Sequence, residues 1–326
     1  MSVASADAFA VDSGMLFRRH DALPTRRPSR RQALTIVAAA MIGLTGIPAA
    51  RAQDASAWDA GHDAAARLIA GALTKMAKPA FIRAGIEIRL DPGWRTYWRD
   101  PGDSGVPPTF DFSGSSNVKS VNVEWPAPHG FPDGAGGNSI GYVDHVILPL
   151  HVVPDDATKP TALHLKFGYD ICGNLCVPAE AQLELALPGN GAEDATLQQA
   201  EQRVPRRVAL GQNAGDNGRP FAITAVHREP GGAHDRVVVD VAAPAGAPVA
   251  LFVEGPTPDW SLPLPEPQDG AETAAKTATE TAANTATRRF SFALDGLPPG
   301  ATPKGSTLTF TAVSGDDAIE VPARLD

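Results

Sequence analysis

Apolar and polar residues alternate along much of residues 80–187, the period of a β-strand with one buried face. The first such stretch, residues 82–90, ends at the turn sequence Asp91-Pro92-Gly93. The clearest alternation covers residues 163–171, where the odd-numbered positions are apolar, and residues 177–187 continue it. A largely apolar, β-branched run from Val143 to Val153 predicts a strand of the buried type. Short strands separated by Gly- and Pro-rich loops predict an antiparallel β-sandwich.

A second group of alternating stretches begins near residue 221 and predicts a second sandwich. Between the two groups, Leu197, Ala200 and Val204 have helical spacing, which predicts a short helix over residues 193–207. The expected fold is therefore all-β, with sandwich domains at residues 53–190 and 211–326 and a linker helix within 191–210. Residues 62–76 are compatible with either a helix or a first strand. Residues 266–289 are rich in Ala and Thr, and we expect a disordered loop there.

The first 52 residues have the features of an export signal. A basic region ending at Arg30-Arg31 precedes a weakly apolar run, and Ala50-Arg51-Ala52 matches an A-x-A cleavage site. Residues 29–34 resemble the twin-arginine export motif. An uncleaved membrane anchor is the alternative, and translation starts at either Met1 or Met15. We expect an exported, periplasmic protein.

Composition narrows the possible partners. The chain has 28 basic and 37 acidic side chains, and loss of residues 1–52, with seven Arg and three Asp, leaves a net charge of −13. An acidic surface argues against nucleic acid as a partner, because phosphate binding needs basic residues. After residue 52, no apolar stretch approaches the roughly 18 residues of a membrane span.

The two cysteines, Cys172 and Cys176, flank a three-residue loop that contains Gly and Asn. Such a loop can close a hairpin and place the two cysteines opposite each other, within reach of a disulfide. The parity of the flanking strands places both sulfurs on the face away from the core, together with Asp170. We therefore expect an exposed disulfide in the export compartment.

The short ring closed by this disulfide favours a redox role over a structural one. A five-residue loop contributes only about 2 kcal/mol of stability, whereas a 100-residue loop contributes about 4.7 kcal/mol. Small, exposed disulfides are the labile type used in thiol–disulfide exchange. A structural staple and metal ligation by the two cysteines remain as alternatives. The spacing is not C-x-x-C, which argues against a thioredoxin fold.

The hairpin sequences Tyr169-Asp170-Ile171-Cys172 and Cys176-Val177-Pro178-Ala179-Glu180 resemble the redox hairpin of the periplasmic N-terminal domain of the DsbD thiol:disulfide interchange proteins. Residues 91–99 and 141–145 support the resemblance, and the three-residue gap between the cysteines is closer to the ScsB branch. The resemblance implies two immunoglobulin-like sandwiches and a redox-active Cys172–Cys176 pair.

The resemblance also implies the partners of the pair. It implies electrons from a membrane-embedded DsbD-, ScsB- or CcdA-like reductase or a thioredoxin-like protein, and periplasmic clients that contain disulfides. Members of the family are connected with cytochrome c biogenesis and copper tolerance. No flavin or NAD fingerprint occurs in the sequence, so we expect no cofactor and dependence on a separate membrane protein for reduction.

Four further residues are candidates for the site. Asp170 is either a proton relay for the thiols or a solvated charge at a strand end. Phe131 lies in the stretch that matches the family's cap loop and is either an apolar lid or an incidental residue of a Gly-rich turn. Tyr97 and Tyr142 are expected to border the site, with core packing as the alternative for aromatic residues near a turn.

No metal motif accompanies the pair. The seven histidines after residue 52 form no H-x-H or H-E-x-x-H motif, and His145 and His151, about 20 Å apart on one strand, are too distant to bind one ion. The leading hypothesis is a periplasmic thiol–disulfide exchange domain, a component of a protein-disulfide reductase. The alternatives are a copper-binding or copper-tolerance protein and a non-catalytic sandwich that binds partner proteins.

Overall fold

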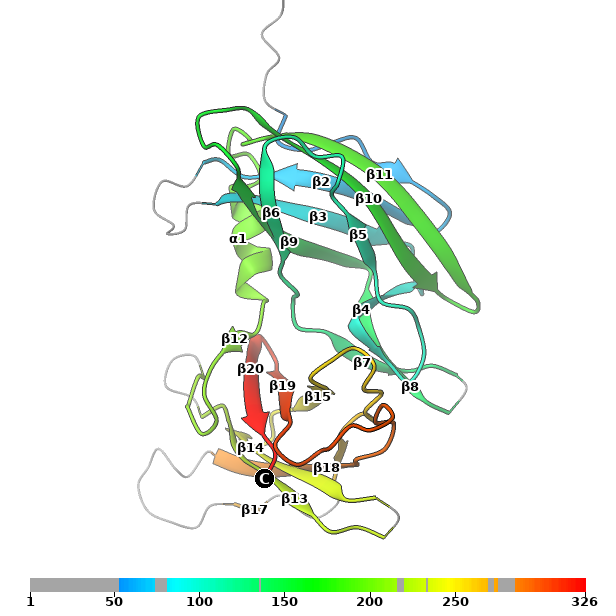
Figure 1. The fold of residues 1–326 in the computed structure, drawn as a ribbon, viewed down its shortest axis with the longest axis vertical. Helices are drawn as coiled ribbons and strands as arrows, with labels where there is room; N and C mark the ends of the chain where they lie inside the picture. The colour runs from blue at the N-terminus through cyan, green and yellow to red at the C-terminus, as the bar shows by residue number, and fades with distance from the viewer. Residues whose placement is uncertain are drawn as a thin grey trace, which may run out of the picture. The chain divides into compact units, whose positions relative to one another are not determined.

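The computed structural model describes residues 53–73, 81–134, 136–215, 220–232, 234–268, 273–274 and 285–326, drawn in colour in Figure 1. The expected export signal, residues 1–52, lies outside the described residues. Four sheets make up most of the described chain, and the pairing of strands is antiparallel except for one short parallel pair. Among the described helices, none has the length and apolar character needed to cross a membrane.

Two sheets form the first sandwich. In order across the first sheet, the strands are β1 (Asp59–Ala60), β2 (Ala64–Ala70), β3 (Ile82–Leu90), β9 (His145–Pro154) and β6 (Val118–Val123). In order across the second, they are β11 (Cys176–Leu187), β10 (Thr161–Cys172), β4 (Arg95–Gly102), β8 (Asn138–Val143) and β7 (His129–Pro132), with β5 (Thr109–Asp111) also paired to β10. The ambiguous segment 62–76 therefore contains a strand, β2.

The core of this sandwich is formed by the alternate apolar residues of both sheets. Ile86 and Leu148 from the first sheet are buried in one cluster with Leu165 and Leu183 from the second. Because the side chains of a strand alternate between its faces, the odd-numbered residues of β10 and those of β11 from Ala179 onward face this core as the sequence predicts. Val177, at the start of β11, is exposed instead.

The run Val143–Val153 is not one strand. Strand β8 ends at Val143 in the second sheet, and β9 begins at His145 in the first. Asp144 between them has φ 58°, a left-handed conformation that Asp tolerates better than β-branched residues do. The carbonyl of Asp144 accepts a hydrogen bond from the Leu90 amide at 2.7 Å, which holds the crossover in place.

The predicted helix is present as α1 (Asp194–Gln202), and it covers the outer face of the first sheet. Leu197 and Ala200 pack against Ile69 and Ile147. A Cβ on Gly85 would lie only 2.9 Å from the Leu197 side chain, so the close approach of the helix depends on glycine at that position. The segment between the sandwiches is thus packed onto the first one.

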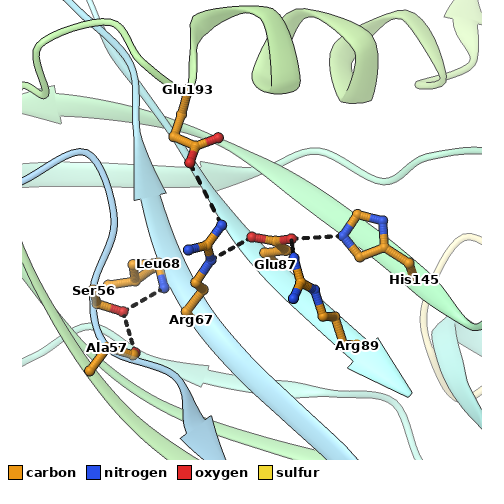
Figure 2. Close-up of polar contacts among 8 residues, drawn as sticks. All are labelled: Ser56, Ala57, Arg67, Leu68, Glu87, Arg89, His145 and Glu193. Atoms are coloured by element: carbon orange, nitrogen blue, oxygen red, sulfur yellow. Dashed lines mark hydrogen bonds and ion pairs between the residues drawn. The ribbon is translucent and has the colours of Figure 1, made fainter. Parts of the chain in front are cut away.

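Beyond the helix, a buried carboxylate organises the same outer face (Figure 2). The Glu87 side chain is 4% exposed, and Arg67 Nε and His145 Nε2 contact it at 2.5 and 2.9 Å, with Arg89 at 3.2 Å. Burial alone would raise the pKa of Glu87, but these hydrogen bonds and the two guanidinium charges lower it below its ordinary value. Both guanidinium groups also stack on Trp58, which ties the start of the described chain to the sheet.

A hydrogen bond also reaches the outer edge of β11. Among the described strands, β11 pairs only with β10, and the amide of Gln182 donates outward to the Asp59 carboxylate at 2.8 Å. Since amide directions alternate along a strand, the other even-numbered residues of β11 also face this edge, and Pro178 is one of them.

The second sandwich follows α1. One sheet has the order β12 (Arg206–Arg207), β20 (Asp317–Arg324), β19 (Thr307–Ser314) and β15 (Ala250–Glu254), where β12 and β20 are parallel. The other has the order β13 (Ala222–Glu229), β14 (Arg236–Pro244), β18 (Thr285–Ala293) and β16 (Glu266–Pro267), with β17 (Thr273–Ala274) also paired to β18. Both contribute to one apolar core, so the prediction of two immunoglobulin-like β-sandwiches is confirmed.

Parts of the segment 266–289, for which we expect a disordered loop, lie in strands. Residues 266–267, 273–274 and 285–289 lie in strands, and the rest of the Ala/Thr-rich segment beyond residue 268 lies outside the described residues. Strand β18 begins at Thr285, inside the Ala/Thr-rich segment, whose composition does not reveal a strand.

Residues from the two sandwiches meet at Arg99. Its guanidinium bonds to the Glu254 carboxylate at 2.6 and 2.8 Å and to Glu320 at 2.6 Å, and these partners raise the pKa of Arg99 although burial alone would lower it. Phe252 packs near Trp98, with ring centroids 6.1 Å apart. Strand β4, which carries Tyr97, therefore contacts residues of the second sandwich as well as its neighbours in the first.

Candidate functional site

The two cysteines close the hairpin formed by β10 and β11. The strands pair in register from Thr161 opposite Leu187 to Cys172 opposite Cys176. The cysteines form a disulfide with Cα atoms 4.1 Å apart, and the Gly173 amide donates to the Leu175 carbonyl across the loop at 3.0 Å. The predicted hairpin and its juxtaposition of the cysteines are thus present in the structure.

The two cysteines differ in exposure. Cys176 is exposed at the start of β11, whereas Cys172 is only 4% exposed. The expectation of an exposed disulfide is therefore wrong for Cys172. As an even-numbered residue of β10, Cys172 points to the outer face of the sheet, and neither cysteine belongs to the core cluster. On that outer face, a side chain from β4 covers Cys172.

That covering side chain is Tyr97. Its hydroxyl lies 2.9 Å from Sγ of Cys172 and 3.4 Å from Sγ of Cys176. The Tyr97 ring is itself packed under the backbone of Gly105, where an added Cβ would lie 2.4 Å from the ring. Because a disulfide sulfur has no proton, the hydroxyl is the donor in both contacts. Tyr97 is thus a direct partner of the disulfide, beyond the border position expected from the sequence.

The start of β4 positions this tyrosine. Thr96 pairs with Ile171 and Arg95 with Cys172, so the start of β4 lies beside the end of β10. The Thr96 hydroxyl donates to the backbone carbonyl of Asp170 at 2.8 Å. Trp94 lies against the cysteine loop, because a Cβ on Gly173 would be 3.2 Å from its ring.

The predicted proton relay, Asp170, is half-buried and faces Pro178 across the hairpin. Burial raises the pKa of Tyr97, and the negative charge of Asp170 raises it further. The hydroxyl of Tyr97 therefore stays protonated at neutral pH and remains a hydrogen-bond donor. The role of Asp170 as a proton relay stays a prediction.

The other two candidates lie farther from the sulfurs. Phe131 is on β7, where its ring stacks on the Arg95 guanidinium at 4.8 Å, so it borders the site through the residue opposite Cys172. Tyr142 is 4% exposed within the core, and its hydroxyl donates to the Pro126 carbonyl at 2.8 Å. Burial raises the pKa of Tyr142 well above its ordinary value. Tyr142 supports the sheet from inside and does not border the sulfurs.

Exposed apolar residues surround the disulfide, which sequence reasoning did not single out. Leu175 in the loop is 75% exposed, and Val177 and Val143 are each 43% exposed. The sequence did contain one signal of this exposed apolar surface. Leu175 lies in a tight loop between the two cysteines, where a side chain cannot reach the core. The positions of Val143 and Arg95 at the site follow only from strand pairing.

His145 and His151, which were considered as metal ligands in the sequence, each contact a carboxylate. His145 contacts Glu87, and His151 Nδ1 lies 3.4 Å from a Glu124 carboxylate oxygen. Among the described residues, no group of three or more His, Cys, Asp or Glu side chains is arranged to hold a metal ion.

Comparisons with known proteins agree with this geometry. Residues 72–188 match the family model of the thiol:disulfide interchange protein DsbD, N-terminal domain. The resemblance seen in the sequence is confirmed for this segment. This segment is thus similar to the N-terminal domain of a thiol:disulfide interchange protein, and the matched residues include both cysteines and Tyr97.

A solved structure extends the comparison beyond the DsbD segment. The crystal structure of the N-terminal periplasmic domain of ScsB from Proteus mirabilis superposes with a TM-score of 0.61, covering 84% of this chain and 99% of that one. The two share 19% sequence identity, so the match shows a common fold. A search of curated proteins finds no match.

Proposed function

We propose that this chain is a periplasmic electron-relay domain, which accepts two electrons from a membrane reductase or a thioredoxin-like protein and passes them to disulfide-containing periplasmic proteins. The observation that carries the proposal is the unequal pair: exposed Cys176 joined to Cys172, which Tyr97 covers. The DsbD match over residues 72–188 and the periplasmic ScsB domain support the same function. The basic and apolar pattern of residues 1–52 supports export.

The exposure of the two cysteines suggests the order of steps. A donor thiolate attacks Sγ of Cys176, the disulfide breaks, and Cys172 leaves as a thiolate beside the Tyr97 hydroxyl. The second donor thiol, once deprotonated, attacks the donor sulfur of the mixed disulfide and releases Cys176. The donor is oxidised to a disulfide, and this chain gains two electrons and two protons. With a client the sequence reverses: Cys176 attacks the client disulfide, and Cys172 then attacks Cys176 and releases the reduced client.

Trapping of mixed disulfides tests this function. In a Cys172→Ser variant, Cys176 has no resolving partner, so we expect disulfide-linked adducts with exported or membrane proteins on non-reducing gels from the native host. A Cys176→Ser variant should form fewer adducts, because Cys172 is covered, and the double Ser variant is the control. If neither single variant forms adducts, while the reduced protein binds Cu(I) and loses it in Cys172→Ser, the copper function replaces this proposal.

The export route has its own test. Replacing Arg30-Arg31 with Lys-Lys should retain the protein in the cytoplasm if the twin-arginine route is used. Export of that variant at the normal rate would show that another route suffices.

A further inference from the structure

An open groove of about 440 Å³ lies beside the cysteine hairpin. It is lined by Trp94, Arg95, Phe131, Pro132, Val143 and Asp144. Strand pairing connects it to the disulfide, since Arg95 lies between Cys172 on one side and Val143 on the other. The Trp94 ring, which forms one wall, also contacts the loop between the cysteines. Any protein that reaches Cys176 therefore passes close to this groove.

The walls of the groove are aromatic and apolar. Of its two charged residues, Arg95 has partners within the protein and Asp144 has no cationic partner among the described residues. Arg95 stacks on Phe131 and donates to the Pro132 carbonyl at 3.0 Å. Asp144 is exposed, and among the described residues no cation pairs with its carboxylate. The left-handed backbone of Asp144 and its hydrogen bond from Leu90 fix its place at the crossover between the sheets. The backbone thus holds an exposed carboxylate-bearing residue beside an aromatic wall.

Most charged side chains near the tip of the hairpin are acidic. Asp91, which precedes Trp94 in the turn, is exposed, as is Glu180 on β11. Asp170 is half-buried next to the pair. Against these carboxylates and Asp144, the groove offers the one guanidinium of Arg95, so this end of the sandwich favours a positively charged partner surface.

We propose that the groove receives a Lys or Arg side chain that flanks the reactive cysteine of a partner protein. The methylene stem of that side chain packs on Trp94 and Phe131, and its charged end pairs with Asp144. Partners with a basic residue near the reactive cysteine are then selected over neutral or acidic ones. This inference rests on the proposed exchange function and specifies its partners.

A pair of peptides tests the inference directly. Each carries one cysteine linked as a mixed disulfide to 5-thio-2-nitrobenzoate, with lysine on both sides in one peptide and acetyl-lysine in the other. The pre-reduced protein, separated from excess reductant, attacks with a thiolate and releases yellow thionitrobenzoate as the protein–peptide disulfide forms. The second cysteine thiolate then attacks the protein sulfur and releases the peptide thiol, so two electrons leave the protein and its disulfide is restored. The release rate at low ionic strength is the measured quantity.

We expect the lysine peptide to react about two- to fivefold faster than the acetyl-lysine peptide, the range of an exposed ion pair. The preference should disappear in Asp144→Asn, because Asn tolerates the left-handed backbone but carries no charge. Asp316→Asn, in the exposed turn between β19 and β20, removes the same charge from the second sandwich and should keep the preference. High salt should reduce the preference in the wild type.

The outcomes separate the two proposals. Equal rates for both peptides in the wild type, or a preference that persists in Asp144→Asn, overturn the groove proposal and leave the exchange function standing. If the reduced protein, with both thiols titratable, releases thionitrobenzoate from neither peptide, the exchange function itself fails.

Discussion

The hydroxyl of Tyr97 lies 2.9 Å from Sγ of Cys172, the sulfur that the structure shields from solvent. A hydroxyl donor at this distance stabilises a sulfur that becomes negatively charged. Burial and the charge of Asp170 raise the pKa of Tyr97, so the donor keeps its proton under the conditions of exchange. The arrangement favours departure of Cys172 as the thiolate when Cys176 is attacked.

Replacing Tyr97 with Phe removes this donor and keeps the ring. A hydrogen bond to a charged group contributes about 1.5–3 kcal/mol, and 1.36 kcal/mol corresponds to a factor of ten. We expect reduction of the disulfide by dithiothreitol at pH 7 to slow by about tenfold. Tyr169→Phe is the matched control, because Tyr169 is buried in the core on β10. Equal rates in wild type and Tyr97→Phe would contradict this role.

Removal of the disulfide should have a modest effect on stability. The hairpin is held by a continuous ladder of strand pairs from residue 161 to residue 187, and the five-residue ring contributes only about 2 kcal/mol. We expect the double variant Cys172→Ala/Cys176→Ala to unfold cooperatively in calorimetry, with a melting temperature lower by less than about 8 °C. Loss of cooperative unfolding would assign the cysteines a structural role.

Glu87→Gln should destabilise the protein without affecting exchange. The substitution keeps the shape but leaves the guanidinium groups of Arg67 and Arg89 without their shared carboxylate. We expect the free energy of unfolding, measured in urea, to fall by about 3 kcal/mol. Glu184→Gln, at a carboxylate that is 69% exposed, should change it by less than about 0.5 kcal/mol.

The same carboxylate gives a pH dependence. The pKa of Glu87 is lower in the folded protein than its ordinary value of 4.5. The stability that the ionised carboxylate contributes is therefore complete above pH 4.5, and it is lost as the pH falls through the lower pKa of the folded state. The wild type should therefore lose its advantage over Glu87→Gln in strong acid. An advantage that is constant from pH 7 to pH 2 would contradict this assignment.

Asp100 predicts a dependence of the opposite sign. Burial raises its pKa to about 6, and Glu254 adds to the increase, although the Gly102 amide opposes it. Between the ordinary value of 3.8 and about 6, the folded state binds more protons than the unfolded state, so stability falls as the pH rises through this window. We expect Asp100→Asn to gain up to about 3 kcal/mol relative to wild type between pH 4 and pH 7. Asp316→Asn should show no such trend.

The strand pattern and the cysteine spacing were sufficient to predict the two sandwiches and the hairpin. Alternation along residues 163–187 determines which faces are buried, and the Gly-Asn loop determines that Cys172 meets Cys176. The division of residues 143–153 between two sheets was missed, because the change depends on the backbone of one residue, Asp144. Apolar periodicity carries no information about such a change.

Contacts between distant strands were also beyond the sequence. Tyr97 is 75 residues from Cys172, and its hydroxyl reaches the sulfur only because β4 pairs with the end of β10. Tyr142 has the same residue type in a similar turn context but faces the core. Residue type alone could not distinguish the two, whereas the pairing of β4 and β8 with their neighbours does.

Pro178 faces the open edge of β11, close to the exposed Leu175 and Val177. An edge strand with free amides is a template for strands of other chains, and exposed apolar side chains beside it increase that risk. Proline offers no amide at its position, and Asp59 occupies the amide of Gln182 farther along. The exposed apolar side chains beside the disulfide therefore remain available to the transient partners of the proposed relay, while the adjoining backbone resists pairing with strands of other chains.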